Sequence, residues 1–366
     1  MIIPLLIVFG TLYLTVVVLL VAGVALAGRR DRPDPAVRPF FSVVIPARNE
    51  EATIEACLES VRDQSYPSNL FEVILVDDNS TDRSGAIAAD QASKVLNMRV
   101  IVPRERSHLT GRSNALAQGI DVSRGEVIMM TDADCVVPPT WVEHTARRFR
   151  EGVGVVGGMT VQRSTSALDG MQSLDWTFLL GIATATVGLR LPLSIIGNNF
   201  SISRKAYDDV GGFRSIKNSV TEDFQLFKSV VNTGRWAYAF MLDPATTNVT
   251  RPCPTVVEII EQKHRWGRGG LDLNWLGYTL VVTAFMTHAL IVLGLLASDG
   301  RALGWLGIKA AADLAFVALV AKRVGRLDDL RSFIWFELYY LLYVVLMPLR
   351  VFFVRKVVWK GRAYAE

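Results

Sequence analysis

The sequence has few cysteines and little excess charge. Its 366 residues include only three cysteines, Cys57, Cys135 and Cys253. Their spacing fits neither a zinc site nor a disulfide framework, so we expect reduced thiols in a cytosolic domain. The formal net charge of +4 is too small to indicate nucleic-acid binding, and anionic lipid headgroups are a sufficient partner for the basic excess.

Charged residues are absent altogether from residues 2–27, an apolar run long enough to cross a bilayer. A cleaved signal peptide is the alternative, but no basic residue precedes the run and the run is too long for the apolar region of such a peptide. Arg29, Arg30 and Arg32 follow directly and, by the positive-inside rule, place the next segment in the cytoplasm. The sequence therefore predicts a transmembrane helix at 1–28.

Further apolar segments lie within residues 273–366. Those at 275–297 and about 302–321 predict a membrane hairpin, and the basic residues that follow return the chain to the cytoplasm. The segment 333–354 contains Pro348 and Arg350, so it either crosses the membrane or bends back along the interface, and we favour a cytoplasmic tail. We expect an integral protein of the cell inner membrane.

Residues 39–270 have the composition of a soluble domain, and the mean hydropathy of the whole chain, +0.30, fits such a domain carrying a few spans. Apolar strand-like runs near 41–46, 71–76, 98–102 and 126–131 alternate with helical patterns. This alternation predicts an α/β fold with a largely parallel, doubly wound sheet. The segment 167–191 is either a helix on the membrane surface or a core helix, and the sequence leaves both open.

Paired acidic residues follow two of the predicted strands, at the end where such sheets bind ligands. Asp132 and Asp134 form a hard oxygen site for Mg²⁺ or Mn²⁺, which a diphosphate can complete. Asp77 and Asp78 can accept hydrogen bonds from a base or a ribose, although a helix N-cap explains part of this motif. Glu50, after the first strand, either holds ribose or adds charge to the first turn of a helix.

Three further motifs supply groups suited to sugar transfer. Arg112, near a predicted helix start, is suited to phosphate oxygens. Glu222 and Asp223 offer a general base for an acceptor hydroxyl, or simply begin a helix after Thr221. Arg265 and Trp266 can neutralise a departing diphosphate and stack on a sugar ring, or anchor a helix at the headgroups.

The order of these motifs resembles the processive-type branch of family 2 inverting glycosyltransferases. The resemblance rests on Asp77-Asp78, Asp132-x-Asp134, Thr221-Glu222-Asp223 and Gln262-x-x-Arg265-Trp266 and covers about residues 40–270. It implies a GT-A-type, Rossmann-like nucleotide-sugar domain at 39–270, a UDP-sugar donor and a divalent metal. The position of Arg112 is often lysine in relatives, which keeps the charge.

The resemblance also implies roles for individual residues. Asp134, with Asp132, holds the metal, and Asp223, with Glu222 beside it, is the catalytic base. Nucleotide and substrate contacts fall to Pro46, Ala47, Glu50, Asp77, Asp78, Arg112, Asp132, Ala133, Gln262, Arg265 and Trp266.

Two kinds of acceptor fit these motifs. Polysaccharide synthases with the same motifs have more spans, which form a channel for the polymer. The few spans here resemble enzymes that glycosylate one lipid, such as ceramide and carotenoid glucosyltransferases. We therefore expect transfer of a single sugar, by default glucose, to a membrane lipid hydroxyl, with residues 197–201 at the floor of the acceptor site; a processive polysaccharide synthase is the alternative. The sequence does not indicate an oligomeric state.

Overall fold

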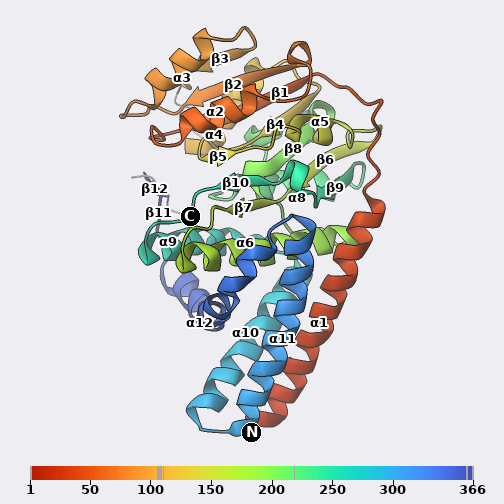
Figure 1. Cartoon of the computed structure of the whole chain (residues 1–366), viewed down its shortest axis with the longest axis vertical. Helices are drawn as coiled ribbons and strands as arrows, with labels where there is room; N and C mark the ends of the chain where they lie inside the picture. Colours follow the sequence, from red (N-terminus) through yellow and green to blue (C-terminus); the bar gives the residue numbers. More distant parts are fainter. Residues whose placement is uncertain (1, 105–108, 110, 218, 360–361, 365–366) are drawn as a thin grey trace. The chain divides into compact units, whose positions relative to one another are not determined.

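The computed structural model describes residues 2–104, 109, 111–217, 219–359 and 362–364 (Figure 1). Its internal contacts divide the chain into two compact units. Unit 1 comprises Met1–Ala27, Gln162–Leu193 and Pro252–Glu366, and unit 2 comprises Gly28–Val161 and Ser194–Arg251. Each unit is described by itself.

Unit 2 is built on a seven-stranded mixed sheet with the strand order β3-β2-β1-β4-β8-β6-β9. The first four of these strands run parallel, as the sequence predicts, whereas β8 is antiparallel to both of its neighbours. The strands are β1 (Phe41–Ala47), β2 (Phe71–Asp77), β3 (Met98–Ile101), β4 (Val127–Met130), β6 (Val153–Gly158), β8 (Phe200–Ser203) and β9 (Ala237–Met241).

The register of the parallel strands brings their carboxyl ends to one edge. Ala47 at the end of β1 pairs with Asp77 at the end of β2, and Val44 pairs with Met130 at the end of β4. By this register Asp132, two residues beyond β4, lies at about the level of Pro46, one residue before the end of β1. The predicted acidic residues thus share one edge of the sheet.

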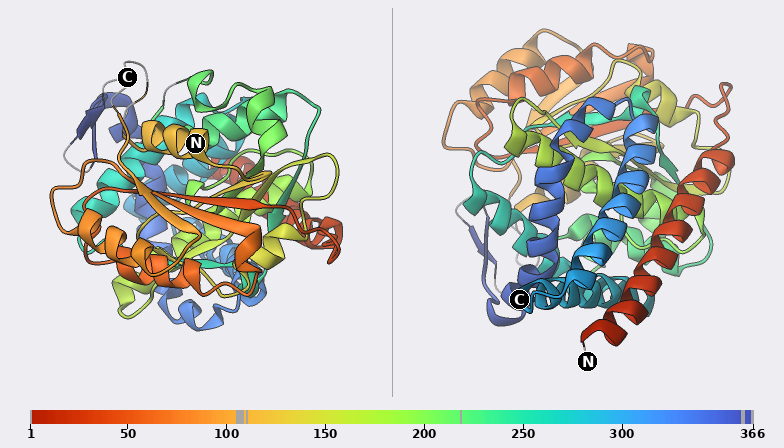
Figure 2. Two further views of the ribbon diagram at one scale, coloured as in Figure 1. Left: turned by 90° about the horizontal axis from the view of Figure 1, so that it is seen from above. Right: turned by 60° about the horizontal axis from the view of Figure 1, so that its bottom comes forward.

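Helices cover both faces of this sheet (Figure 2). Alternate residues of the strands pack against α2 (Ile54–Arg62), α3 (Ser84–Ser93) and α5 (Trp141–Ala146) in one large apolar core. The opposite face of β1 and β2 receives α4 (Gly111–Val122), where a Cβ on Gly119 would lie 2.6 Å from Val44 and 2.8 Å from Val76. This close crossing holds α4, which carries Arg112 in its first turn, against the sheet. The remaining helices of unit 2 are α7 (Arg204–Asp209) and α8 (Glu222–Asn232).

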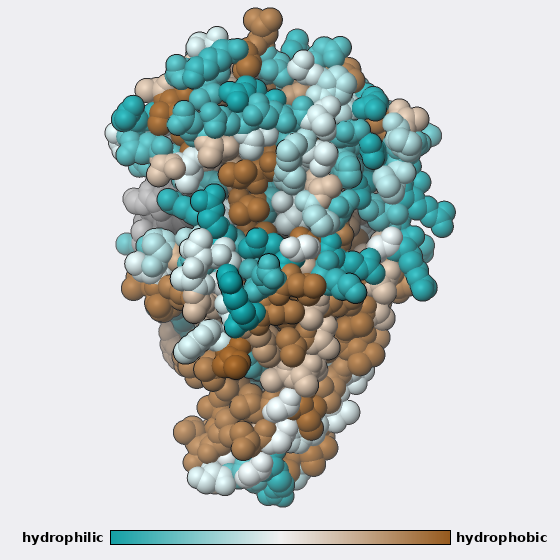
Figure 3. Space-filling model, viewed as in Figure 1, coloured by the Kyte–Doolittle hydropathy of each residue, from teal (hydrophilic) through white to brown (hydrophobic). Residues whose placement is uncertain are grey.

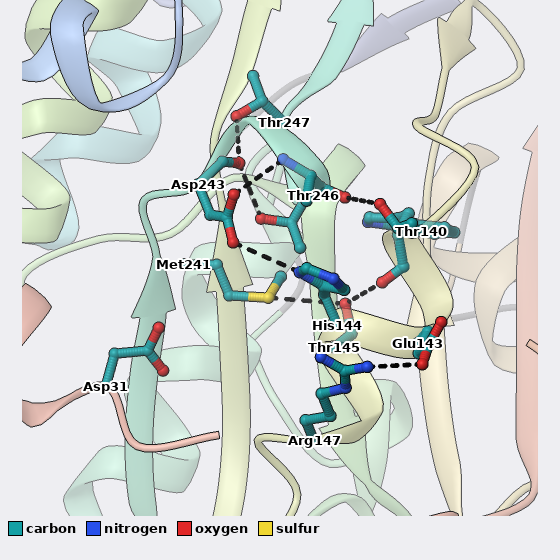
Figure 4. Close-up of polar contacts among 12 residues, drawn as sticks. Asp31, Thr140, Glu143, His144, Thr145, Arg147, Met241, Asp243, Thr246 and Thr247 are labelled. Atoms are coloured by element: carbon teal, nitrogen blue, oxygen red, sulfur yellow. Dashed lines mark hydrogen bonds and ion pairs between the residues drawn. The ribbon is translucent and has the colours of Figure 1, made fainter. Parts of the chain in front are cut away.

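A small second sheet in the order β5-β10-β7 lies beside the acidic edge, because β5 follows Asp134 directly. Its strands are β5 (Cys135–Val136), β7 (Thr160–Gln162) and β10 (Asn248–Thr250). The turn before β10 is clasped to α5: Asp243 accepts a hydrogen bond from the Ala245 amide and faces His144 at 3.4 Å (Figure 4). Thr140 donates to the Ala245 carbonyl at 3.0 Å. The acidic turn is thus backed by rigid structure.

Unit 1 consists mainly of long helices. They are α1 (Ile2–Arg30), α6 (Ala167–Gly188), α9 (Val256–Gly269), α10 (Trp275–Leu296), α11 (Gly300–Arg323) and α12 (Phe333–Phe353), followed by the strand pair β11 (Val357–Trp359) and β12 (Arg362–Tyr364). Among the described residues, four helical segments are long and apolar enough to cross a membrane: 2–30, 275–296, 300–323 and 327–353. Their outward surface is largely apolar (Figure 3). Pro348 lies inside α12, which is assigned as one helix through it.

The segment that the sequence leaves open, 167–191, is mostly the helix α6, which is buried along nearly its whole length. It packs on α11 and α12 and crosses the residues of α1 closely, where Gly23 and Gly188 leave no room for a side chain. Small residues at such crossings let helix backbones approach each other. The structure therefore favours a core helix of unit 1 over a helix lying on a membrane surface.

The two units do not follow the predicted domain boundaries. Residues 162–193 and 252–270 lie inside the predicted domain 39–270 but group with the long helices of unit 1. The grouping follows from packing, since α6 and α9 both contact α12. The boundaries 1–28, 39–270 and 273–366 remain a prediction about functional segments.

Candidate active site

The loops after β1 and β2 are tied together by their own polar groups. The amide of Asn49 donates to the Ser80 hydroxyl at 3.1 Å, and the amide of Glu50 donates to the Ser84 hydroxyl at 2.7 Å. Asn49 and Asn79 have positive φ values of 53° and 56°, which asparagine tolerates better than most residues. These hydrogen bonds hold the two loops together at this edge of the sheet.

The structure distinguishes the two adjacent acids of β2. Asp77 accepts a hydrogen bond from the amide of Ser80 at 3.0 Å, so its carboxylate stabilises the turn. Asp78 is buried, and its carbonyl accepts from the guanidinium of Arg48 at 2.7 Å. Glu50 is also buried, and its carboxylate accepts from the Thr53 hydroxyl at 3.1 Å. Asp77 thus has a structural role in this turn.

Asp132 and Asp134 lie in a tight turn after β4, closed by the Cys135 amide donating to the Asp132 carbonyl at 3.0 Å. Asp132 is held by Arg112, whose Nε lies 2.8 Å from the Asp132 carboxylate. The described residues contain no group of three or more acidic, histidine or cysteine side chains that could hold a metal. A divalent cation here would need oxygens from a ligand, which fits the predicted coordination with a diphosphate.

The cysteines near this turn are packing residues. Cys57 and Cys135 are both fully buried, and burial raises the pKa of each thiol far above its ordinary value. The neighbouring carboxylates Asp132 and Asp134 raise both pKa values further. Neither thiol is therefore a nucleophile at neutral pH.

Arg112 connects the Asp132–Asp134 turn to the start of α8. Its guanidinium forms an ion pair with Asp132, a second with Glu222, and a 3.1 Å hydrogen bond to the Gly197 carbonyl. Burial alone would lower its pKa, but Asp132, Glu222 and Asp223 together raise it. The side chain is only 13% exposed, so Arg112 is a largely buried crosslink between these segments, and its contact with phosphate oxygens stays a prediction.

The two predicted catalytic acids, which are adjacent at the start of α8, have different surroundings. Glu222 is buried and paired with Arg112, so its carboxylate is already neutralised. Asp223 is half-buried, and its carboxylate accepts from the amide of Phe224 at 2.8 Å. A Cβ on Gly197 would lie 2.7 Å from the Asp223 carboxylate and 3.0 Å from the Arg112 guanidinium, so this backbone packs closely against both side chains. Asp223 as the base, with Glu222 beside it, stays a prediction.

The segment at 197–201 supports the site from below. Asn199 donates to the carbonyls of Met159 and Thr246 at 2.7 and 2.8 Å and accepts from the Trp141 indole at 3.0 Å. Asn198 accepts from the Thr160 hydroxyl at 2.8 Å. Both side chains are buried and form hydrogen bonds within the protein, and the acceptor floor at 197–201 stays a prediction.

Sequence reasoning missed Asn248 on β10. Its amide donates to the Asn198 carbonyl at 2.8 Å and lies 3.5 Å from the hydroxyl of Thr131, the residue before Asp132. It therefore links the turn after β4 to the segment before β8. No local pattern marks a lone asparagine for this role.

Gln262, Arg265 and Trp266 lie on α9, in unit 1. Their spacing of i, i+3 and i+4 places them on one face of the helix, and all three are partly exposed. The indole of Trp266 packs edge-on against Trp176 of α6, with ring centroids 5.2 Å apart. The structure thus brings together Arg112, Asp132, Glu222 and Asp223 within unit 2, and presents the Arg-Trp motif on one helix face of unit 1.

The mixed sheet with acidic loops at its carboxyl edge is a GT-A-type, Rossmann-like fold, the class found in nucleotide-sugar transferases. A family model described as glycosyl transferase family 2 matches residues 42–224, half of the chain. The chain belongs to glycosyl transferase family 2. The match includes every predicted site residue except Gln262, Arg265 and Trp266.

Individual relatives are more distant. A β-monoglucosyldiacylglycerol synthase from Nostoc sp. is 29% identical over 241 residues, covering 63% of this chain and 49% of that protein. A probable glycosyltransferase, YdaM, from Bacillus subtilis is 28% identical over 236 residues, covering 63% and 55%. The chain thus spans about half the length of the curated relatives it matches.

One solved structure resembles nearly the whole chain. The mannosyltransferase PcManGT from Pyrobaculum calidifontis, in complex with GDP-Man and Mn²⁺, is 18% identical, with a TM-score of 0.63 over 96% of this chain and 99% of that one. At this identity the likeness concerns the fold.

Proposed function

We propose that this protein transfers one sugar from a UDP-sugar to the hydroxyl of a membrane lipid, with inversion at the anomeric carbon. The observation that carries the proposal is the arrangement around Arg112, which joins the Asp132–Asp134 turn to the Glu222–Asp223 helix start within one unit. A diphosphate-binding turn and a general base at such a junction are what glycosyl transfer requires.

In this proposal the donor lies along the carboxyl edge of the sheet. Glu50 and Asp78, both buried beside the end of β1 and β2, contact the nucleoside, with Pro46, Ala47 and Ala133 forming the walls. Asp134, with Asp132, would hold Mg²⁺ or Mn²⁺, which would supply positive charge for the diphosphate.

Asp223 acts as the base. It takes the proton from the acceptor hydroxyl as the oxygen attacks the anomeric carbon, the bond from that carbon to the diphosphate breaks, and the nucleoside diphosphate leaves with the bonding electron pair. Glu222 holds Arg112 and thereby keeps positive charge near the leaving group. Gln262, Arg265 and Trp266 of unit 1 are assigned, from the family resemblance, to contacts with the donor diphosphate and the acceptor.

A lipid acceptor is supported by two observations. Four helical segments in the part of the chain that the structure describes are long and apolar enough to cross a membrane, and the relative from Nostoc is a β-monoglucosyldiacylglycerol synthase. In the proposed topology the catalytic domain is cytoplasmic, where nucleotide sugars are made, and the protein is integral to the cell inner membrane. A processive polysaccharide synthase is the competing function.

The test is mass spectrometry of the product. The full chain in nanodiscs containing diacylglycerol is incubated with Mn²⁺ and, separately, UDP-glucose, UDP-galactose and GDP-mannose. We expect one donor, by default UDP-glucose, to give a lipid that is heavier by a single hexose, and Asp223→Asn to give far less of it. A ladder of polymer lengths would establish the processive alternative, and no product with any donor would contradict glycosyl transfer to diacylglycerol.

A further inference from the structure

A buried ion pair lies directly behind the Arg-Trp motif in unit 1. Lys263, between Gln262 and Arg265 on α9, forms an ion pair with Asp175 on α6. Each residue is only 1% exposed. Neither side chain has a place in the proposed chemistry, although Lys263 belongs to the same helical turn as the motif.

The same lysine contacts the indole of the motif. Its Nζ lies over the Trp266 ring, 4.2 Å from the centroid, and 5.6 Å from the ring centroid of Tyr343 on α12. A cation over an indole face is attracted by the ring quadrupole, more strongly where water is excluded. One face of Trp266 is therefore occupied by Lys263.

The helix α6 fixes both residues at once. Asp175 pairs with Lys263, while the next residue, Trp176, packs its ring edge-on against Trp266. Asp175 and Trp176, which are consecutive on α6, thus contact Lys263 and Trp266, which are three residues apart on α9. The indole is confined by a cation on its face and by a second indole at its edge.

A buried ion pair is not needed for stability alone, because well-packed apolar side chains of similar volume are often as good or better. Burial raises the pKa of Asp175 and lowers that of Lys263, and their mutual attraction opposes both shifts. Each charge therefore depends on its partner. Such a costly pair beside a functional motif indicates a role in geometry.

We propose that Lys263 and Asp175 are positioning residues that fix the orientation of the Trp266 indole, and with it the face of α9 that carries Gln262 and Arg265. The inference rests on the proposed function for its effect on sugar transfer. Its structural content, that the pair orients the indole, stands without that function.

The decisive variant is the double substitution Lys263→Met with Asp175→Leu. It removes both charges while keeping similar volume, so the fold is expected to persist, as thermal unfolding in detergent will show. We expect kcat for lipid glycosylation to fall between about tenfold and a hundredfold, since small misplacements of a binding group have effects of this size. The dissociation constant for UDP, measured by calorimetry, stays within twofold because the nucleoside contacts lie in unit 2.

Two companion variants separate positioning from general packing. Lys263→Arg keeps a cation that can face both Asp175 and the indole, and we expect it to recover most of kcat. The matched control is Arg148→Met with Asp31→Leu, which removes a largely buried ion pair of unit 2 that contacts no predicted site residue. We expect kcat of this control to remain at the wild-type value.

Near-ultraviolet circular dichroism tests the structural content without any substrate. The difference spectrum between wild type and Trp266→Phe isolates the signal of the oriented indole, and we expect the Lys263→Met, Asp175→Leu variant to lose that signal. A folded double variant with the wild-type spectrum and kcat would overturn the proposal. If the wild type transfers no sugar to lipid, the proposed function fails, and the spectra alone decide whether the pair orients Trp266.

Discussion

Two cations with little solvent exposure, Arg112 in unit 2 and Lys263 in unit 1, differ in the number of carboxylates around them. Arg112 is surrounded by Asp132, Glu222 and Asp223, so carboxylates outnumber the cation. Lys263 meets a single carboxylate, Asp175, and its remaining neighbours include aromatic rings. Asp132 and Asp223 are also partly exposed, whereas Asp175 is not.

The difference shows how one type of interaction serves two purposes. An excess of partly exposed carboxylates is costly until a cation or a proton arrives, which agrees with the metal and the base proposed for the region around Arg112. A balanced and fully buried pair needs no ligand and can only fix geometry. Substitutions in the two regions should therefore differ in kind.

Metal removal should have the largest effect. Without a divalent cation, Asp132 and Asp134 repel the donor diphosphate and nothing neutralises the leaving group. We expect EDTA to reduce sugar transfer by roughly a thousandfold or more, as expected for several kcal/mol of lost transition-state stabilisation. The measurement is product formation before and after dialysis, with Mg²⁺ or Mn²⁺ added back.

Asp134→Asn is the matched variant for this prediction. It should retain the fold and raise the Mn²⁺ concentration required for half-maximal activity. Full activity in the presence of EDTA would remove Asp132 and Asp134 from the metal site and would break the comparison at its first point.

Asp223→Asn should have the next largest effect, because it removes the base but keeps the size of the side chain. We expect kcat to fall between about a hundredfold and ten-thousandfold, the usual contribution of general base catalysis, with KM for the donor nearly unchanged. Initial rates over a range of donor concentrations provide both parameters. Glu222→Gln is the control for position.

The control variant has a different expected signature. Loss of the Glu222 carboxylate removes an ion pair with Arg112, so it should lower the stability of unit 2 more than Asp223→Asn does. If Glu222→Gln abolished turnover while Asp223→Asn preserved it, the roles of the two acids would have to be exchanged.

Replacing Arg112 should have a smaller effect that depends on the substitute. Arg112→Lys keeps the charge but cannot hold Asp132, Glu222 and the Gly197 carbonyl together, and the loss of one charge-assisted hydrogen bond corresponds to about tenfold to a hundredfold in kcat. Arg112→Gln should be worse, because it leaves the buried Glu222 unpaired. Equal activities of the two variants would show that the charge of Arg112 is unimportant.

Much of unit 2 could be predicted from the sequence, since its strands are short apolar runs followed directly by acidic residues. Parallel pairing then places Asp77, Asp78 and Asp132 at one edge by register alone. The antiparallel strand β8 could not be predicted, because a buried strand of four apolar and small residues carries no sign of its direction. Its position depends on how the chain returns after α6.

The ion pairs of the site and of the adjoining helices could not be predicted from local sequence patterns. Arg112 and Glu222 are 110 positions apart, and Lys263 and Asp175 are 88 apart, so no spacing rule joins them. The burial of α6 was open to inference, because a helix that is apolar on nearly every side is usually buried. The buried helix also accommodates two acids, because Asp169 closes a capping box at its start and Asp175 has a buried partner.

A third buried cation, Lys309 on α11, sharpens the comparison with the smallest expected effect on turnover. Lys309 lies 2.9 Å from Asp313 and 2.6 Å from Glu337 on α12, and Tyr13 on α1 donates to Asp313 at 2.7 Å. Carboxylates outnumber the cation here too, but the described residues of this cluster include none of the predicted site. We therefore expect a role in holding the apolar helices together.

Lys309→Met leaves Asp313 and Glu337 without their cation, and breaking such a buried cluster typically costs about 3–5 kcal/mol. We expect a markedly lower unfolding temperature in detergent, with kcat per folded molecule unchanged, and Lys309→Arg should restore most of the stability. The contrast with Lys263 is then complete, since one buried lysine alters stability without turnover and the other alters turnover in a variant that stays folded. A loss of kcat in folded Lys309→Met would mean that the helix cluster also sets the geometry of α9. The connection would run through α12, where Tyr340 lies next to Lys309 and Tyr343 lies next to Lys263.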